Sequence, residues 1–368
     1  MPAVRIALFA AGVFIALGTS ASAVRTFVVP RAVPVLLSRT VFVILRWLFT
    51  LSARRSHGYE GLDRRLAYYA PTSLLMLPAL WLTLMLLAFS LMFGAIGNLS
   101  PDEAMTIAGS SLLTLGFAEP VGWAQEVLSF IAAAIGVSLL ALLITYLPTI
   151  YGAFTRRETL VSLLEVRAGS PPWAVTMLIR YQQIGMIDRA DELFQQAELW
   201  FADIEESHTS LGSLAFFRSP LPERSWITAA GALLDAASLS QSVLDLPDDP
   251  HAALCIRSGT LCLRRISDFF DIAYDPDPRP DDPVSITRDE FDHALELLEE
   301  VGTPIQADRE QAWKDFAGWR VNYDSVLLSL ASLCQAPVAP WSSDRALPVK
   351  PTLRIRRRRH VPPQGSEV

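Results

Sequence analysis

Long uncharged apolar runs dominate the first part of the chain, and ordinary mixed sequence follows them. Residues 6–24, 66–101 and 127–155 contain no Asp, Glu, Lys or Arg. A helix rises about 1.5 Å per residue, so each run is long enough to cross the roughly 30 Å hydrocarbon core of a bilayer. We therefore predict an all-α membrane protein with three transmembrane helices, followed by a domain in water beyond residue 158.

A short polar segment separates the second run from the third, and its first residues favour a helix start. Ser100 suits the N-cap, Pro101 the first helical position and Glu103 the third, which together form a capping box. The predicted helix over 101–112 would be about 18 Å long, roughly half a bilayer. It would re-enter the membrane from the outer side and point the negative end of its dipole at the membrane centre.

The residues after this helix follow the Thr-x-Gly-aromatic pattern of cation filters. Such a filter replaces the hydration shell of an ion with backbone carbonyls, and glycine lets the chain turn them toward the axis. Irregular backbone at that depth must be shielded by protein or line water, so several loops are expected around one axis. The predicted ion filter comprises Thr114, Leu115, Gly116, Phe117 and Ala118, with Glu119 at the outer mouth.

The distribution of charge sets the expected orientation. Eight arginines lie in residues 25–65 against two acidic residues, and Arg156 and Arg157 follow the third run. The segment between the second and third runs has acidic charges only. Because basic residues favour the cytoplasmic side, we expect an outer N-terminus and a cytoplasmic C-terminal domain, in a multi-pass protein of the cell's inner (plasma) membrane.

The second half of the chain is acidic, although its last residues are not. The net charge is −7, yet residues 1–160 hold 11 Arg against 7 acidic residues. An acidic second half argues against nucleic acid as a partner. We expect the arginine-rich tail over 346–368 to be disordered and solvated. The expected partners are potassium or other monovalent cations, membrane lipids and further copies of the chain.

The first apolar run has two interpretations. Arg5, the apolar stretch after it and the small residues at 21–23 also suit a secretory signal with its cleavage site. Cleavage would leave the arginine-rich residues 25–65 outside, against the charge bias. Only a membrane crossing by residues 35–51, with Arg39 and Arg46 inside it, would avoid this. We favour an uncleaved first span over residues 1–24.

Residues 25–65 are then expected to lie on the cytoplasmic side as an interfacial helix and a linker. Residues 35–51 suit an amphipathic helix at the inner membrane surface. Its arginines Arg39 and Arg46, and Arg54 just beyond it, are expected to reach the lipid headgroups.

The remaining chain, over 159–345, is predicted to be an all-helical cytoplasmic domain. Capping signals and periodic apolar faces predict helices over 172–183, 188–206, 224–243 and 288–301. Cys255, Cys262 and Cys334 lack the Cys-x-x-Cys spacing of metal or redox sites, so we interpret them as core thiols of a reducing compartment.

No enzyme or sensor motif is present in the sequence. The five histidines are scattered, and no His-Glu-x-x-His pattern, nucleophile elbow, phosphate loop or dinucleotide-binding glycine motif occurs. The acidic, proline-rich residues 275–283 lack the glycine and final glutamate of a calcium loop. We therefore expect no catalytic residues, no resident metal and no cofactor, with potassium only as the permeant ion.

Residues 67–158 resemble the pore module of the potassium-channel superfamily, in particular bacterial ion-channel proteins with one pore loop, described as two-pore-domain-like. The matching parts are an outer helix, a pore helix, a filter and an inner helix, over 70–98, 101–112, 114–119 and 127–151. Residues 25–31 also look like that bacterial group. The resemblance implies a homotetramer with one axial pore. It also implies that Thr114 forms the innermost ion site through its hydroxyl and carbonyl groups.

Two positions depart from the family pattern, and two others suggest gating. Ala118 replaces a glycine, and its methyl group disfavours the positive φ that turns the last carbonyl to the ion. Leu113 replaces a threonine whose hydroxyl group would bond behind the filter. Gly136 and Pro148 are interpreted as a gating hinge of the inner helix.

The alternative hypothesis is a membrane-tethered sensory or interaction protein with a degenerate, non-conducting pore module.

Overall fold

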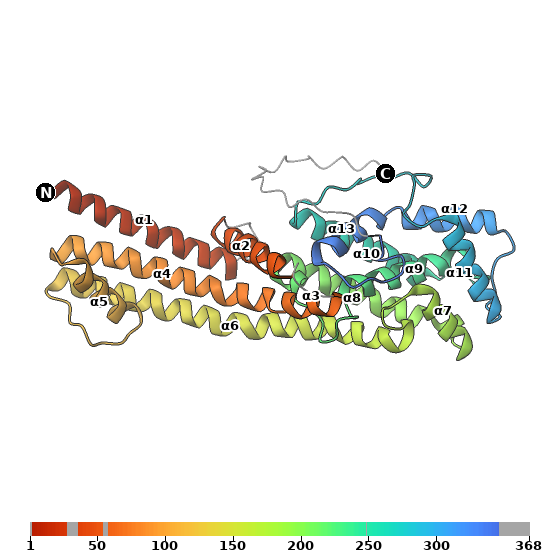
Figure 1. Ribbon diagram of the computed structural model, residues 1–368, viewed down its shortest axis with the longest axis horizontal. Helices are drawn as coiled ribbons and strands as arrows, with labels where there is room; N and C mark the ends of the chain where they lie inside the picture. Colours follow the sequence, from red (N-terminus) through yellow and green to blue (C-terminus); the bar gives the residue numbers. More distant parts are fainter. Residues whose placement is uncertain (1, 28–35, 54–57, 248, 346–368) are drawn as a thin grey trace.

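The computed structural model describes residues 2–27, 36–53, 58–247 and 249–345. Over these residues every regular element is helical, apart from an isolated antiparallel bridge between Leu244 and Ile305. Long helices form one end of the molecule and a compact group of shorter helices forms the other (Figure 1). The first six helices are α1 (Pro2–Phe27), α2 (Leu36–Ala53), α3 (Gly58–Leu66), α4 (Tyr69–Gly97), α5 (Pro101–Leu112) and α6 (Trp123–Ala168).

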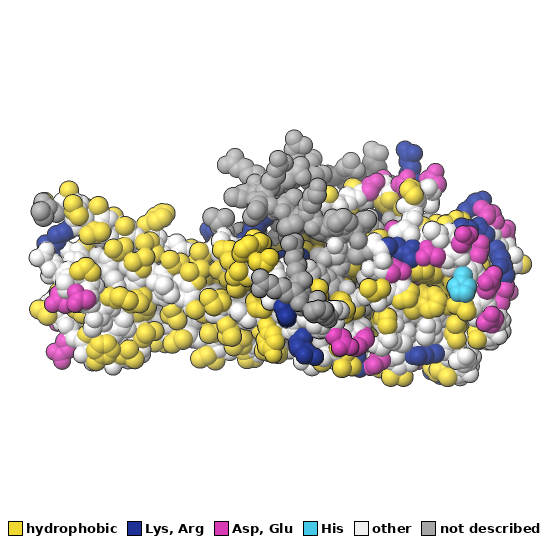
Figure 2. Space-filling view, in the orientation of Figure 1, with side chains coloured by type: hydrophobic (Ala, Val, Ile, Leu, Met, Phe, Trp, Pro, Cys, Tyr) yellow, Lys and Arg dark blue, Asp and Glu magenta, His cyan; other side chains and the backbone are white. Residues whose placement is uncertain are grey.

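Three stretches are long and apolar enough to cross a membrane. They are Pro2–Phe27, Gly58–Gly97, which takes in α3 and α4, and Trp123–Ala168. Figure 2 shows mostly hydrophobic and uncharged side chains along the long helices, with acidic side chains and a basic one at their far end and charges of both signs over the helical domain. The predicted all-helical class and three candidate spans are confirmed, and they suggest a multi-pass membrane protein.

Helix α1 packs against α4 with its first turn beside the last turn of α4. The Arg5 guanidinium donates to the carbonyls of Ala95 at 2.7 Å and Ile96 at 2.8 Å, which caps the C-terminus of α4. At Gly12 a Cβ would lie 2.6 Å from the Ala88 carbonyl oxygen, so the two backbones approach closely. Small residues at such crossings are typical of helix pairs in membranes.

Helix α6 continues without interruption from the far end of the molecule into the helical domain (Figure 1). Its 46 residues make a rod of about 69 Å, well beyond the thickness of a bilayer. The predicted inner helix ended at residue 151 and the predicted domain boundary fell after 158, and both positions lie inside α6. The helical domain is therefore joined to the apolar helices by a continuous rod.

Helix α2 forms near its predicted bounds, but Arg46 does not extend toward lipid headgroups. Its guanidinium donates to the Leu333 carbonyl at 2.8 Å and lies 5.2 Å from the centre of the Phe216 ring. That expectation for Arg46 was wrong, because the free carbonyls at the C-terminus of a helix attract a cation. Arg54 lies outside the described residues, and the direction of Arg39 stays a prediction.

The helical domain surrounds α9, which is buried along almost its whole length. Its other members are α7, α8 and α10–α13, with the short 3-10 helices η1 (Ile187–Arg189) and η2 (Gly212–Phe216). The α-helices span Ala174–Gln183, Asp191–Ser210, Trp226–Ser242, Pro250–Phe269, Arg288–Glu300, Arg309–Arg320 and Asp324–Cys334. The four predicted helices therefore form, although three begin two or three residues later than expected. Cys255 and Cys262 are buried core thiols as predicted, whereas Cys334 is half-buried.

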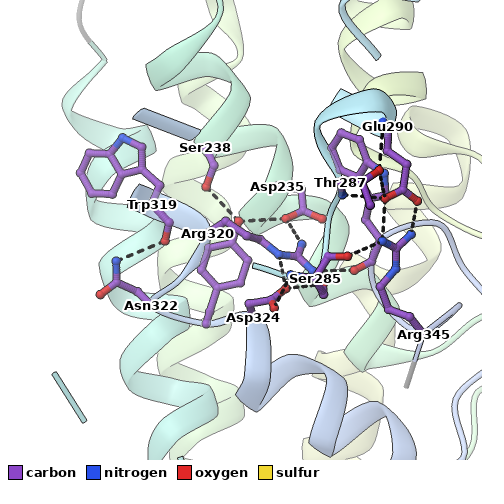
Figure 3. A network of polar contacts seen from close by, with 12 residues as sticks. Asp235, Ser238, Ser285, Thr287, Glu290, Trp319, Arg320, Asn322, Asp324 and Arg345 are labelled. Atoms are coloured by element: carbon purple, nitrogen blue, oxygen red, sulfur yellow. Dashed lines mark hydrogen bonds and ion pairs between the residues drawn. The ribbon is translucent and has the colours of Figure 1, made fainter. Parts of the chain in front are cut away.

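A buried arginine links three helices of this domain to the last described segment (Figure 3). Arg320 pairs with Asp235 on α9 and with Asp324 on α13, and it donates to the Trp341 carbonyl at 2.6 Å. Burial alone would lower the pKa of Arg320, but the two carboxylates raise it above its ordinary value. The guanidinium therefore stays charged and holds the segment around Trp341 against the domain.

Candidate functional site

Helix α5 lies beside the ends of α4 and α6 that are remote from the helical domain (Figure 1). It begins as predicted, because the Glu103 carboxylate accepts from the Ser100 amide at 2.9 Å and from the Ser100 hydroxyl at 2.7 Å. Its bounds, Pro101–Leu112, match the predicted range. The chain then returns through residues 113–122, here called the return loop, to the start of α6.

Helix α5 ends in a Schellman motif that places Thr114 in the left-handed region. The Leu115 amide donates to the Ser110 carbonyl at 2.8 Å and the Thr114 amide donates to the Ser111 carbonyl at 3.1 Å. Glycine usually occupies the left-handed position of this motif, whereas Thr114 has a φ of +54°. A β-branched residue is strained there, and such strain gathers at functional positions. The strained residue is the one predicted to form the innermost ion site.

Three amides of the return loop face one residue, Ser110. The Leu115 and Gly116 amides lie 2.8 Å and 3.5 Å from the Ser110 carbonyl oxygen, and the Ala118 amide lies 3.1 Å from the Ser110 hydroxyl. In a trans peptide the carbonyl points away from the amide of the next residue. The carbonyls of Thr114, Leu115 and Phe117 are therefore directed away from Ser110.

The carbonyl oxygens of the loop are left without donors. Among the described residues, none donates a hydrogen bond to a carbonyl of residues 113–117. These residues are exposed in the single chain, with Phe117 two-thirds exposed. Gly116 has a φ of +73°, as a turning glycine requires. The carbonyls of residues 113–117 thus present acceptors that the described residues do not use, which is the polarity that a cation needs.

Two sequence departures have a different meaning in the structure. Ala118 does not adopt a positive φ, so its methyl group carries no left-handed strain. The hydroxyl group expected to be missing because of Leu113 is supplied from Ser110, one turn back on α5. Sequence reasoning missed Ser110, although the serine pair at positions 110 and 111, in the last turn of α5, was a usable signal.

The end of the return loop next to α6 is held by Gln125. This buried side chain accepts from the Val121 amide at 3.0 Å, and its Nε2 fills the space where a Cβ of Gly97 would lie. Glu119 is exposed near this end, and its role at an outer mouth stays a prediction.

Gly136 belongs to the site, whereas Pro148 lies away from it. A Cβ at Gly136 would overlap the Leu112 carbonyl oxygen, so the end of α5 rests on α6 at this glycine. A second contact joins the same helices, because the Ser111 and Ser129 hydroxyls are 2.6 Å apart. Helix α6 is continuous through Gly136 and Pro148, and the hinge role of both residues stays a prediction.

A second polar cluster connects α6 to the helical domain. Arg157 is fully buried and donates to the carbonyls of Leu214 and Phe217, each at 2.8 Å, and to the carboxylate of Glu158 at 2.9 Å. His208 lies beside it, and burial together with the arginine charge lowers the pKa of His208 well below its usual value. A neutral imidazole therefore faces the guanidinium.

A third cluster gathers at the C-terminus of α13. Arg218 pairs with Asp63 of α3 at 2.6 Å and donates to the carbonyls of Cys334 at 3.0 Å and Gln335 at 2.9 Å. Two cavities beside it offer only about 20 Å³ each, the room of a water molecule. In the described part of the chain, no group of three or more His, Cys, Asp or Glu side chains is placed to hold a metal ion.

No protein-family model, no curated protein and no solved structure matches this chain. The resemblance to the potassium-channel pore superfamily therefore depends on residues 67–158 themselves and stays a prediction.

Proposed function

We propose that the protein is a homotetrameric channel that conducts monovalent cations passively, potassium first among them. The observation that carries the proposal is the polarity of the return loop, in which the amides of Leu115, Gly116 and Ala118 face Ser110 while the carbonyls of 113–117 have no donor among the described residues. Carbonyl oxygens presented in this way can replace the hydration shell of an ion.

The exposure of the return loop supports an assembly of several copies. Irregular backbone at membrane depth is tolerated only where protein covers it or water fills the space. Contact with Gly136 puts the end of α5 about 20 Å along α6 from Trp123, which is deep within a bilayer if α6 crosses it. Four loops around one axis meet this requirement, because neighbouring copies cover each loop and the loops together line one pore. Each chain then supplies one quarter of that pore.

Charge supports an outer location for the loop and a cytoplasmic location for the helical domain. Acidic residues lie at the start of α5, in the return loop and at the start of α6, beside Arg5, whereas the other arginines of residues 1–160 flank the opposite ends of the apolar helices. In the plasma membrane this asymmetry orients the filter outward. The continuous α6 then joins the pore to the helical domain, so a change in that domain is transmitted by a rigid element.

The alternative function is a membrane-tethered sensory or interaction protein whose pore module does not conduct. Ala118, in place of the family glycine, and the large helical domain favour it. This alternative requires only that the helical domain be held at the membrane, so Thr114 and Gly116 would be free to change without loss of function.

Flux from liposomes, combined with the mass of the detergent-solubilised protein, tests the proposal. We expect tetramers of the 40.6 kDa chain that release potassium from liposomes, and no release from Gly116→Asp. Gly302→Asp is the matched control, since Gly302 has a φ of +72° and, like Gly116, no atom within 4 Å of the place that a Cβ would take. Monomers, or tetramers that release no monovalent cation, would reject the channel.

A further inference from the structure

We infer that Ser110 is the positioning residue that sets the cation selectivity of the return loop. The inference rests on the proposed function and adds a residue to it. Ser110 lies in the last turn of α5, is 2% exposed, and faces the loop from behind, so it does not contact the ion itself.

Ser110 directs the loop carbonyls through two different groups. Its carbonyl oxygen accepts from the Leu115 and Gly116 amides, and this main-chain contact is available to any residue at the position. Its hydroxyl accepts from the Ala118 amide at 3.1 Å, and this contact depends on the side chain. Among the described residues it is the only side-chain acceptor for an amide of residues 113–118.

The hydroxyl contact determines the direction of one carbonyl. Because the peptide between Phe117 and Ala118 is planar and trans, holding the Ala118 amide toward Ser110 turns the Phe117 carbonyl away from it. Ala118 stands where the family has a glycine, so the sequence pattern alone does not fix the orientation of the peptide between Phe117 and Ala118. The hydroxyl bond from Ser110 restrains this peptide. Without that bond the Phe117 carbonyl rotates, and the preference for one dehydrated cation over another falls.

The neighbouring serine provides a matched control. Ser111 is also buried in the last turn of α5, but its hydroxyl bonds to the hydroxyl of Ser129 on α6 and not to the loop. Removing the Ser111 hydroxyl therefore weakens the packing of α5 on α6 while leaving the Ala118 amide bound.

The test is the ratio of potassium to sodium flux in liposomes, measured with the yield of assembled protein. We expect Ser110→Ala to lower the ratio about fivefold, which corresponds to one neutral hydrogen bond of about 1 kcal/mol. Ser110→Thr keeps the hydroxyl and restores the ratio, whereas Ser111→Ala lowers only the yield or thermal stability. An unchanged ratio in Ser110→Ala, or an equal loss of selectivity in Ser111→Ala, overturns the inference.

Amide hydrogen exchange of the wild-type protein tests the same bond without any variant. The Ala118 amide is expected to exchange more slowly than that of Phe117, which has no acceptor among the described residues. Equal exchange overturns the role of Ser110. A wild-type protein that passes no cation instead rejects the proposed function, whatever the exchange result, so the two failures can be distinguished.

Discussion

The main-chain carbonyl of Leu112 occupies the space that a side chain at Gly136 would need. This contact places the end of α5, and therefore the return loop, at a defined position along α6. Gly136 thus has a packing role that does not depend on any bending of α6. The glycine is required because two backbones meet there.

Replacing Gly136 should displace the return loop. Gly136→Ala forces α5 away from α6, and overpacking of this kind costs about 1–3 kcal/mol. We expect a lower melting temperature of the detergent-solubilised protein and loss of potassium flux. Gly152→Ala is the matched control on the same helix, because its Cβ would meet only Arg156 Nη1, at 3.9 Å. Equal effects of the two substitutions would contradict the packing role.

Thr114 is predicted to lower the stability of the folded protein while it supports ion flux. Thr114→Gly removes a left-handed β-branched residue, whose strain is about 1–2 kcal/mol, although the flexibility of glycine in the unfolded chain cancels part of the gain. We expect a higher melting temperature together with an approximately tenfold or greater loss of potassium flux, because each chain loses an ion ligand.

Asn98→Gly is the control for this substitution. Asn98 ends α4 with a φ of +52°, which asparagine tolerates well, so little strain is released there. Flux that survives in Thr114→Gly would show that the hydroxyl group of Thr114 is not an ion ligand.

The sequence was sufficient to predict the helical class, the three apolar spans and the bounds of α5. Uncharged runs of spanning length have few alternatives to helices in a membrane, and a complete capping box marks where a helix begins. The length of α6 was not predictable, because polar residues such as Arg156 and Arg157 look like a membrane boundary. In the structure the helix continues, since Arg157 is neutralised and covered by other elements.

The candidate site was predictable in part. Thr114 and Gly116 were identified from spacing, and the structure gives both a positive φ. The roles of Ser110 and Gln125 were not predicted, because each depends on a side-chain bond to a main-chain amide of the return loop, which residue spacing alone does not show. The headgroup contacts expected for Arg46 were wrong, because a helix terminus far along the sequence lies within its reach.

Arg157 should be critical for the joint between α6 and the helical domain. Arg157→Leu leaves the carboxylate of Glu158 without its partner and the carbonyls of Leu214 and Phe217 without donors. Breaking a buried pair of this kind costs about 3–5 kcal/mol, so we expect poor yield and a much lower melting temperature.

The neighbouring Arg156 is the control. Its guanidinium is exposed and pairs with Asp203 at the surface, where such pairs contribute about 0–1 kcal/mol. Arg156→Leu should therefore leave the melting temperature within a few degrees of the wild type, and a similar loss in both variants would argue against a special role for Arg157.

Low pH should lower the stability of the helical domain by protonating the carboxylate of Glu290 (Figure 3). Bonds from Arg345 and from the Thr287 amide lower the pKa of Glu290 to about 2, from an ordinary value near 4.5. A lowered carboxylate pKa contributes stability that is present above pH 4.5 and is lost as the pH falls toward 2. We expect the melting temperature to fall over that range, and Glu290→Gln to reduce this acid-dependent part.

Glu300→Gln on the same helix is the control for the acid experiment. Glu300 is exposed, and the structure gives it no hydrogen bond or ion pair among the described side chains. The acid-dependent change should be retained in this variant. If Glu290→Gln and Glu300→Gln give the same pH profile as the wild type, the pair of Glu290 and Arg345 does not contribute to the acid response.

The most direct test of the account is to locate a permeant ion. A structure of the protein in lipid, determined with rubidium in place of potassium, should show four chains around an axis and rubidium on that axis between the carbonyls of residues 114–117. Single subunits whose return loop faces lipid, or a well-ordered tetramer without an ion at those carbonyls, would contradict the account.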